Sequence, residues 1–137
     1  MSAKMKVKNF FEQIQAAQPD PTVGIRIIQV TGHNAMGLYV AELAPYQSIS
    51  AHYHRAGSEI YQIVQGEGQI YTGVPLTGDR VSWKTSVGVH RGDCFTVEEG
   101  GVHHLENTGS LPLIVIIICP ASHITTDRFI VQGTIPQ

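Results

Sequence analysis

The sequence predicts an all-β protein of the sandwich or barrel class. From residue 24 onward, short segments rich in β-branched residues recur about every ten residues, and clusters of glycine and polar residues separate nearly all of them. A helical pattern is found only near the start of the chain, so parallel strands joined by helices are excluded. With 137 residues the chain has the size of one domain.

The helical pattern covers residues 6–18. A short apolar stripe ends at Ile14, Asn9 can cap the start, and Pro19 breaks the chain afterwards. We expect residues 1–22 to form an N-terminal helical extension and residues 23–137 to form the β domain. The expected strands cover residues 24–30, 35–43, 48–54, 59–65, 68–73, 80–90, 93–98, 103–107, 111–119 and 126–132.

The composition excludes several classes of protein. Hydrophobic residues make up 42% of the chain, enough for a buried core, and the net charge of −2 gives no basic surface for nucleic acid. The longest apolar run has seven residues, Leu113 to Cys119, which argues against a membrane span. The lysines near the start precede no apolar stretch, so we expect a cytoplasmic protein in which Cys94 and Cys119 are free thiols.

The expected strand 111–119 is apolar on both faces, whereas a sandwich strand usually has one wet face. Its outer face therefore needs cover. Either the N-terminal segment or a second copy of the chain can supply it, and we favour a homodimer because symmetric dimers are the commonest assembly.

Histidine spacing in residues 51–59, AHYHRAGSE, predicts a metal site. Side chains on a strand alternate, so His52 and His54 face the same side, with Cβ atoms about 6–7 Å apart. A turn at Gly57 reverses the chain and brings Glu59 back beside the pair. Two imidazoles and a carboxylate suit a divalent cation.

A third imidazole is available from residues 98–107, EEGGVHHLEN. His103 and His104 are adjacent and face opposite sides of a strand, so only one of them can join the same ion. Spacing alone leaves open which one does.

Two motifs in the chain resemble those of the cupins. The pattern His52-x-His54-x4-Glu59-x6-Gly66 is similar to their first motif from its HxH onward, and Gly92-x7-Gly100-x2-His103-x3-Asn107 is similar to their second. The resemblance implies a small jelly-roll β-barrel with one metal ion inside. It also implies His52, His54, Glu59 and His103 as the metal ligands, and leaves His104 out.

The chain departs from the family pattern at two positions. Tyr46 stands where the first motif begins with glycine, and Glu98 stands where the second carries proline. Both are turn or backbone positions, so they bear on loop shape and leave the implied ligands unchanged.

Three histidines and a glutamate leave coordination positions open for a small molecule, unlike a closed structural zinc site. Iron, manganese, nickel, cobalt, copper and zinc are all chemically admissible as the one divalent transition metal. The resemblance implies a metal-dependent enzyme of the dioxygenase, decarboxylase or isomerase type, acting on a small oxygen-bearing organic substrate. A non-catalytic module that binds or senses a small molecule is the alternative.

Glu59 is the first catalytic candidate, as a ligand that also accepts a proton. Tyr61, two residues along the same strand, is the second, as a hydrogen-bond donor to a metal-bound oxygen. His104 and His90 are weaker acid–base candidates, and Arg55 is a candidate contact for an anionic substrate. His33, His90 and His123 are each interpreted as exposed or hydrogen-bonded histidines outside the metal site.

Overall fold

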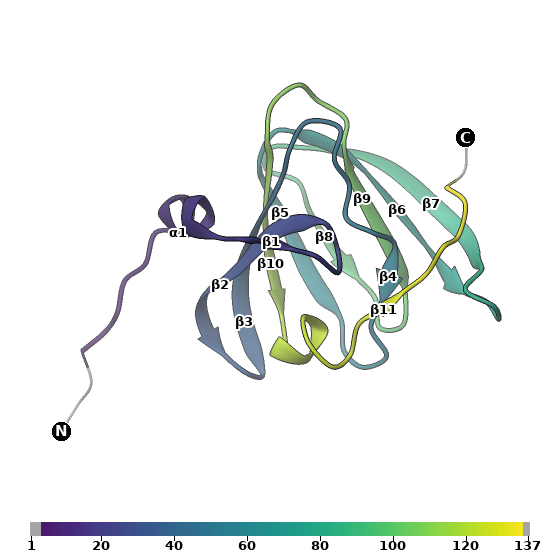
Figure 1. Ribbon diagram of the computed structural model, residues 1–137, viewed down its shortest axis with the longest axis horizontal. Coiled ribbons are helices and arrows are strands. Elements are labelled where there is room, and N and C mark those ends of the chain that lie inside the picture. The colour runs from purple at the N-terminus through teal and green to yellow at the C-terminus, as the bar shows by residue number, and fades with distance from the viewer. Residues whose placement is uncertain (1–3, 136–137) are drawn as a thin grey trace.

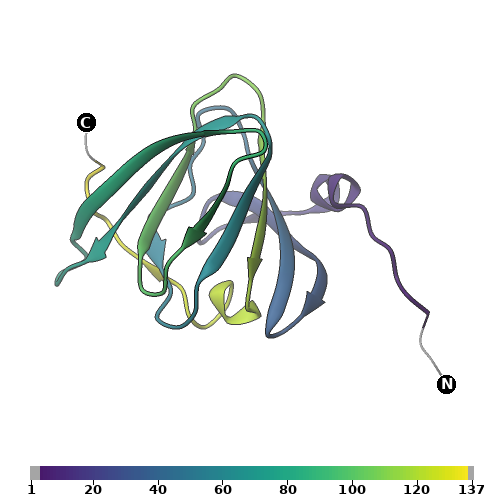
Figure 2. The ribbon, with the colours of Figure 1, turned by 180° about the vertical axis from the view of Figure 1, so that it is seen from behind.

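The fold is described from a computed structural model that defines residues 4–135. Residues 1–3 and 136–137, the outer ends of the two expected regions, lie outside the described residues. Two antiparallel sheets face each other and enclose the core, with one short helix outside them (Figures 1 and 2), so the predicted all-β jelly-roll class is confirmed. Within the described part of the chain, no helix has the length and apolarity that a membrane crossing requires.

The first sheet has the strand order β1-β2-β3-β10-β5-β8, and the second has the order β11-β4-β9-β6-β7. The elements of the first sheet are β1 (Pro19–Asp20), β2 (Ile25–His33), β3 (Met36–Leu43), β10 (Leu113–Cys119), β5 (Glu59–Gln65) and β8 (Cys94–Val97). Those of the second are β11 (Phe129–Ile130), β4 (His52–Tyr53), β9 (Val102–Asn107), β6 (Glu67–Pro75) and β7 (Val81–His90).

The helix α1 (Phe10–Ala16) is shorter than the predicted range 6–18. Asn9 caps it as predicted, because its side chain accepts hydrogen bonds from the N–H groups of Phe11 and Glu12. Residues 6–8 precede this cap and are exposed, so no packed face supports helix there. Seven residues are too few for a stable isolated helix, so α1 depends on its contacts with the sheet.

The outer face of β10 is covered by this helix. Ile14 and Ala17 pack with Ile114 and Ile116 of β10 in a cluster separate from the barrel core. The inner-facing residues of β10 belong to the main core between the sheets: Leu113, Val115, Ile117 and Cys119. The N-terminal segment therefore gives the cover that the apolar strand needs, and the homodimer stays a prediction.

The predicted strands 48–54 and 126–132 are much shorter in the structure, as β4 and β11. In the segment before β4, the N–H of Ile49 bonds to Leu105 O and the N–H of Ser50 to Val23 O. These two consecutive residues thus bond to two different segments of the chain, so the backbone does not pair continuously with one neighbouring strand. Both short strands lie at the end of the barrel that holds the histidines, next to a 3₁₀ turn, η1 (Ala121–His123).

Candidate metal centre

Three strands bring the predicted ligands together inside the barrel. His52 lies in β4 directly opposite His103 of β9, His54 follows β4, and Glu59 is the first residue of β5. The four side chains are buried, with exposed fractions of 5%, 2%, 3% and 3% respectively. Residues that are 51 positions apart in sequence, such as His52 and His103, become neighbours because β4 and β9 pair in one sheet.

The turn between His54 and Glu59 is held at three of its four residues by side-chain carboxylates. The Asp127 carboxylate accepts hydrogen bonds from the backbone N–H groups of Arg55, at 2.7 Å, and Ala56, at 3.0 Å. The Glu99 carboxylate accepts another from Gly57 N, at 2.8 Å. Gly57 has a φ of 85°, the left-handed region that glycine adopts without strain. This turn reverses the chain, as predicted, and returns Glu59 to the histidine pair.

Backbone carbonyls fix the orientation of each imidazole. The Nδ1 atoms of His52, His54 and His103 lie 2.7, 2.6 and 3.1 Å from the carbonyl oxygens of Ser50, Asp127 and Gly101. A carbonyl oxygen only accepts, so each Nδ1 carries a proton, and the Nε2 of a neutral ring then has the free lone pair. Metal-binding histidines use this arrangement to set their tautomer.

The free ligand atoms converge on one point. Glu59 Oε1 lies 3.3 Å from His54 Nε2 and 3.2 Å from His103 Nε2, and none of these three atoms has a hydrogen-bond partner among residues 4–135. Lone pairs that face one another across this distance repel unless a cation lies between them. Ligands about 2.1 Å from one ion and at right angles are about 3.0 Å apart, close to these separations.

The charge state of the cluster suits a divalent cation. Burial, together with neighbouring His103, lowers the pKa of His52 well below its ordinary value, so the ring stays neutral. Burial alone would raise the pKa of Glu59, but His103, His123 and His54 outweigh it and the pKa falls well below its ordinary value. The cluster therefore holds a neutral His52 ring beside an ionised Glu59 carboxylate, and both are in the form that binds metal.

His123 lies in the centre, although the sequence interpretation placed it outside. It is hydrogen-bonded, one of the two alternatives expected for it: Nδ1 lies 3.0 Å from Glu59 Oε2 and Nε2 lies 2.7 Å from Ala56 O. Its ring stacks on His54, with centroids 3.9 Å apart and planes 2° apart. Burial lowers the pKa of His123, but its bonds to Glu59 and Ala56 outweigh this and raise it.

The other acid–base candidates occupy different places. Tyr61 is 2% exposed, lines the cavity beside the ligands and lies edge-on to His103 at 6.0 Å between ring centroids. Burial, and then the charge of Glu59, raises the pKa of Tyr61 well above its usual value. His104 points away from the cluster, with Nε2 3.3 Å from Glu106 Oε1. His90 is exposed and pairs with Asp93.

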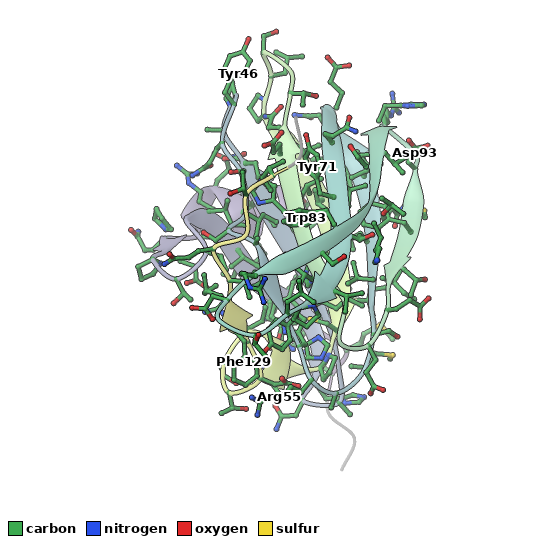
Figure 3. All side chains as sticks on the ribbon, turned by 90° about the vertical axis from the view of Figure 1, so that its right-hand side faces the viewer. Tyr46, Arg55, Tyr71, Trp83, Asp93 and Phe129 are labelled. Atoms are coloured by element: carbon green, nitrogen blue, oxygen red, sulfur yellow. The ribbon has the colours of Figure 1, made fainter. Side chains whose placement is uncertain are left out.

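Arg55 lies outside the cavity, because its guanidinium stacks 4.2 Å above the Phe129 ring at one end of the barrel (Figure 3). Arg128 takes a place at the cavity wall that the sequence did not indicate, and its Nη1 lies 2.9 Å from Asp20 Oδ2. No motif marks His123, Asp127 or Arg128, so local pattern gave no signal for any of them.

The ligands open into a narrow cavity that is mostly aliphatic. The cavity and its open mouth together measure about 320 Å³. The part that can hold the centre of a water molecule is about 20 Å³, which is room for about one water. Three of the four predicted ligands, His52, His54 and Glu59, line the cavity together with His123. The other walls are Val23, Ile25, Ile27, Ile49, Tyr61, Ile117, Ile124 and Arg128.

Solved structures with similar folds include a protein with a double-stranded β-helix domain from Klebsiella pneumoniae (TM-score 0.67, 20% identity, covering 94% of this chain and 99% of that one). A predicted oxalate decarboxylase from Thermotoga maritima is also similar (TM-score 0.63, 21% identity, 84% and 98%). The cupin domain of CENP-C from Drosophila melanogaster is a third (TM-score 0.64, 17% identity, 87% and 84%). At these identities the likeness concerns the fold alone.

Two curated relatives from Arabidopsis thaliana match over 92 residues, which are 66% of this chain and 40% of theirs. They are germin-like protein subfamily 1 member 20, at 29% identity, and member 16, at 30%. The chain thus spans less than half of these relatives. The sequence model of the cupin domain matches residues 39–119, which contain both motifs and more than half of the chain, and the protein therefore belongs to the cupin family.

Proposed function

We propose that the protein is a metal-dependent enzyme that binds one divalent transition metal through His52, His54, Glu59 and His103. The convergence of bare Nε2 atoms and Glu59 Oε1, buried and without hydrogen-bond partners among the described residues, is the observation that carries the proposal. Unpartnered buried polar atoms are costly, and a cation at their common point removes the cost.

The aliphatic walls of the cavity favour a small substrate with an apolar body and an oxygen atom that reaches the metal, and they must move apart to admit it, because the free space holds about one water molecule. The walls offer few polar contacts, and Arg128 is already paired with Asp20. When bound, the metal supplies Lewis-acid or dioxygen chemistry. Tyr61 keeps its proton at neutral pH and orients a substrate oxygen by donating a hydrogen bond from its hydroxyl group, while Glu59 is the candidate proton acceptor. The reaction class is that of a dioxygenase, decarboxylase or isomerase. The similar fold of a predicted oxalate decarboxylase accords with this range.

A small-molecule binding module without catalysis is the second candidate. The described cavity residues include no free acid or base apart from the ligands and Tyr61, because both ring nitrogens of His123 are hydrogen-bonded. This scarcity of proton-transfer groups favours a binding role, and direct assays of turnover distinguish the two.

The first experiment measures metal content. Protein purified without chelator is expected to hold close to one divalent ion per chain, and His52→Ala and His103→Ala are expected to lose it. His104→Ala is the matched control, since His104 is the neighbour of His103 on β9 and faces the other way. Retention of the ion by His103→Ala would contradict the ligand assignment.

The second experiment separates the enzyme from the binding module. The metal-loaded protein is tested for oxygen uptake and product formation with diols, β-diketones, thiols and sugars. The enzyme proposal expects turnover of at least one compound and a lower kcat in Tyr61→Phe. Saturable binding without turnover of any bound compound would instead support the binding module.

A further inference from the structure

We propose that His123 is a positioning residue of the metal centre, which holds Glu59 Oε2 by a hydrogen bond and leaves Oε1 as the one oxygen of Glu59 that faces the ligand imidazoles. This inference rests on the proposed metal site. It concerns a residue that lies outside both sequence motifs and outside the segment that matches the cupin domain.

The position of His123 is fixed by a stack on one ring face and by hydrogen bonds at both ring nitrogens. It ends the 3₁₀ turn η1, its exposed fraction is 0%, and its ring lies parallel to that of His54 at 3.9 Å between centroids. A cavity would result if the ring moved away, since the interior is close-packed. His123 and His54 therefore form a rigid pair beside Glu59.

Both ring nitrogens of His123 are donors. Nε2 lies 2.7 Å from Ala56 O, and a carbonyl oxygen only accepts. Nδ1 lies 3.0 Å from Glu59 Oε2, and a carboxylate oxygen likewise accepts. A ring that donates from both nitrogens has no lone pair for a metal. Two groups of side chains are close enough to share an ion: His52, His54 and His103, and His54, Glu59 and His123. His123 is the member whose two ring nitrogens are both engaged in hydrogen bonds.

The bond to His123 determines how Glu59 can coordinate. Carboxylates bind cations through one oxygen or through both. Two-oxygen coordination by Glu59 would turn Oε2 toward the imidazoles that Oε1 now faces, and this rotation would strain its 3.0 Å hydrogen bond to the buried His123 ring. His123 thus favours coordination through Oε1 alone, so that three nitrogens and one oxygen leave two positions of a six-coordinate ion for substrate or water.

Two amide variants separate this role from simple support of the turn. The amide nitrogen of asparagine lies near the position of histidine Nδ1, so His123→Asn keeps a donor for Glu59. The amide nitrogen of glutamine lies near the position of Nε2, so His123→Gln keeps a donor for Ala56 O. Both variants lose the stacked ring, which makes each the control of the other.

The measurement is the affinity for Co²⁺ and Zn²⁺, by competition with a chelating indicator at one fixed pH on variants shown to be folded by thermal melting. We expect His123→Gln to bind about 10–100-fold more weakly than the wild type, the usual loss when the partner of a ligand is removed. His123→Asn is expected to stay close to the wild type, and the visible Co²⁺ spectrum is expected to change in the glutamine variant alone. The reverse order, with glutamine unchanged and asparagine weakened, would overturn the proposal.

A measurement on the wild-type protein covers the case in which the variants do not fold. In the Zn²⁺-loaded protein, ¹⁵N spectra of the histidine rings are expected to show two protonated nitrogens for His123 and one for each ligand histidine. A bare nitrogen on His123 would refute the positioning role. Failure of the wild type to bind metal would contradict the proposed function, whereas equal affinity of the wild type and His123→Gln would contradict only this inference.

Discussion

Replacement of Asn107 by leucine is expected to destabilise the barrel strongly. Asn107 ends β9, four residues after His103, and is 2% exposed. Its Nδ2 donates to Leu43 O at 3.1 Å and to Leu111 O at 2.8 Å, and its Oδ1 accepts from Gly109 N at 2.9 Å. One side chain thus joins β9 to β3 and to the loop before β10.

Leucine has a similar size but makes none of these three hydrogen bonds. At about 1 kcal/mol for each bond, the free energy of unfolding is expected to fall by about 3 kcal/mol, with a larger loss if the backbone groups find no water. This is a large part of the total stability of a domain, about 5–15 kcal/mol.

The assay is unfolding in urea, followed by tryptophan fluorescence and circular dichroism. The midpoint is expected to fall while the slope stays constant, because the unfolded surface is unchanged. Glu106→Gln is the matched control: Glu106 precedes Asn107 on β9, its side chain is 34% exposed, and we expect a change within about 0.5 kcal/mol. A loss below about 1 kcal/mol for Asn107→Leu would refute the assignment of three productive hydrogen bonds.

Three further outcomes are expected. Tyr46 has a φ of 63°, in the left-handed region that strains a residue other than glycine. Tyr46→Gly should therefore raise the free energy of unfolding by about 1 kcal/mol, and a lower midpoint of urea unfolding would contradict this. Burial and then the charge of Glu59 raise the pKa of Cys119, so a thiol reagent should modify exposed Cys94 quickly and Cys119 only after unfolding. Burial opposes ionisation of Asp20, but Arg128 and the backbone N–H groups of Thr22 and Val23 together outweigh it and lower the pKa of Asp20. The stabilisation from the Asp20 carboxylate is therefore present above about pH 4 and is lost as the pH falls through the folded pKa. Acid unfolding of Asp20→Asn should lack this component, and identical acid profiles would argue against the pair.

The general fold could be predicted because its signals are local. Turn residues separate the strands at short intervals, and Asn9 caps α1 as the sequence indicates. The length of β4 could not be predicted, since Ile49 and Ser50 bond to two different partners and both bonds depend on the tertiary path of the chain.

Local spacing likewise indicates some residues of the candidate site and gives no sign of those that only the tertiary fold brings there. His52 and His54 share a face by strand alternation, and the turn at Gly57 accounts for Glu59. The choice of His103 over His104 came from the family resemblance alone. In the structure, His103 Nε2 faces Glu59, whereas His104 Nε2 faces Glu106. His123 lies 64 residues after Glu59 and meets it only because η1 follows β10 back to this end of the barrel, so no spacing rule could find it.

The tail after Cys119 supplies the groups that surround the ligands, although the matched cupin segment ends at residue 119. His123 holds Glu59, and Asp127 orients His54 through its carbonyl group. Exchange of this tail between relatives would therefore change the surroundings of the proposed metal site without altering any of the four proposed ligands. Transfer of the segment up to residue 119 alone would carry over the four proposed ligands but omit His123 and Asp127, which hold Glu59 and His54 in position.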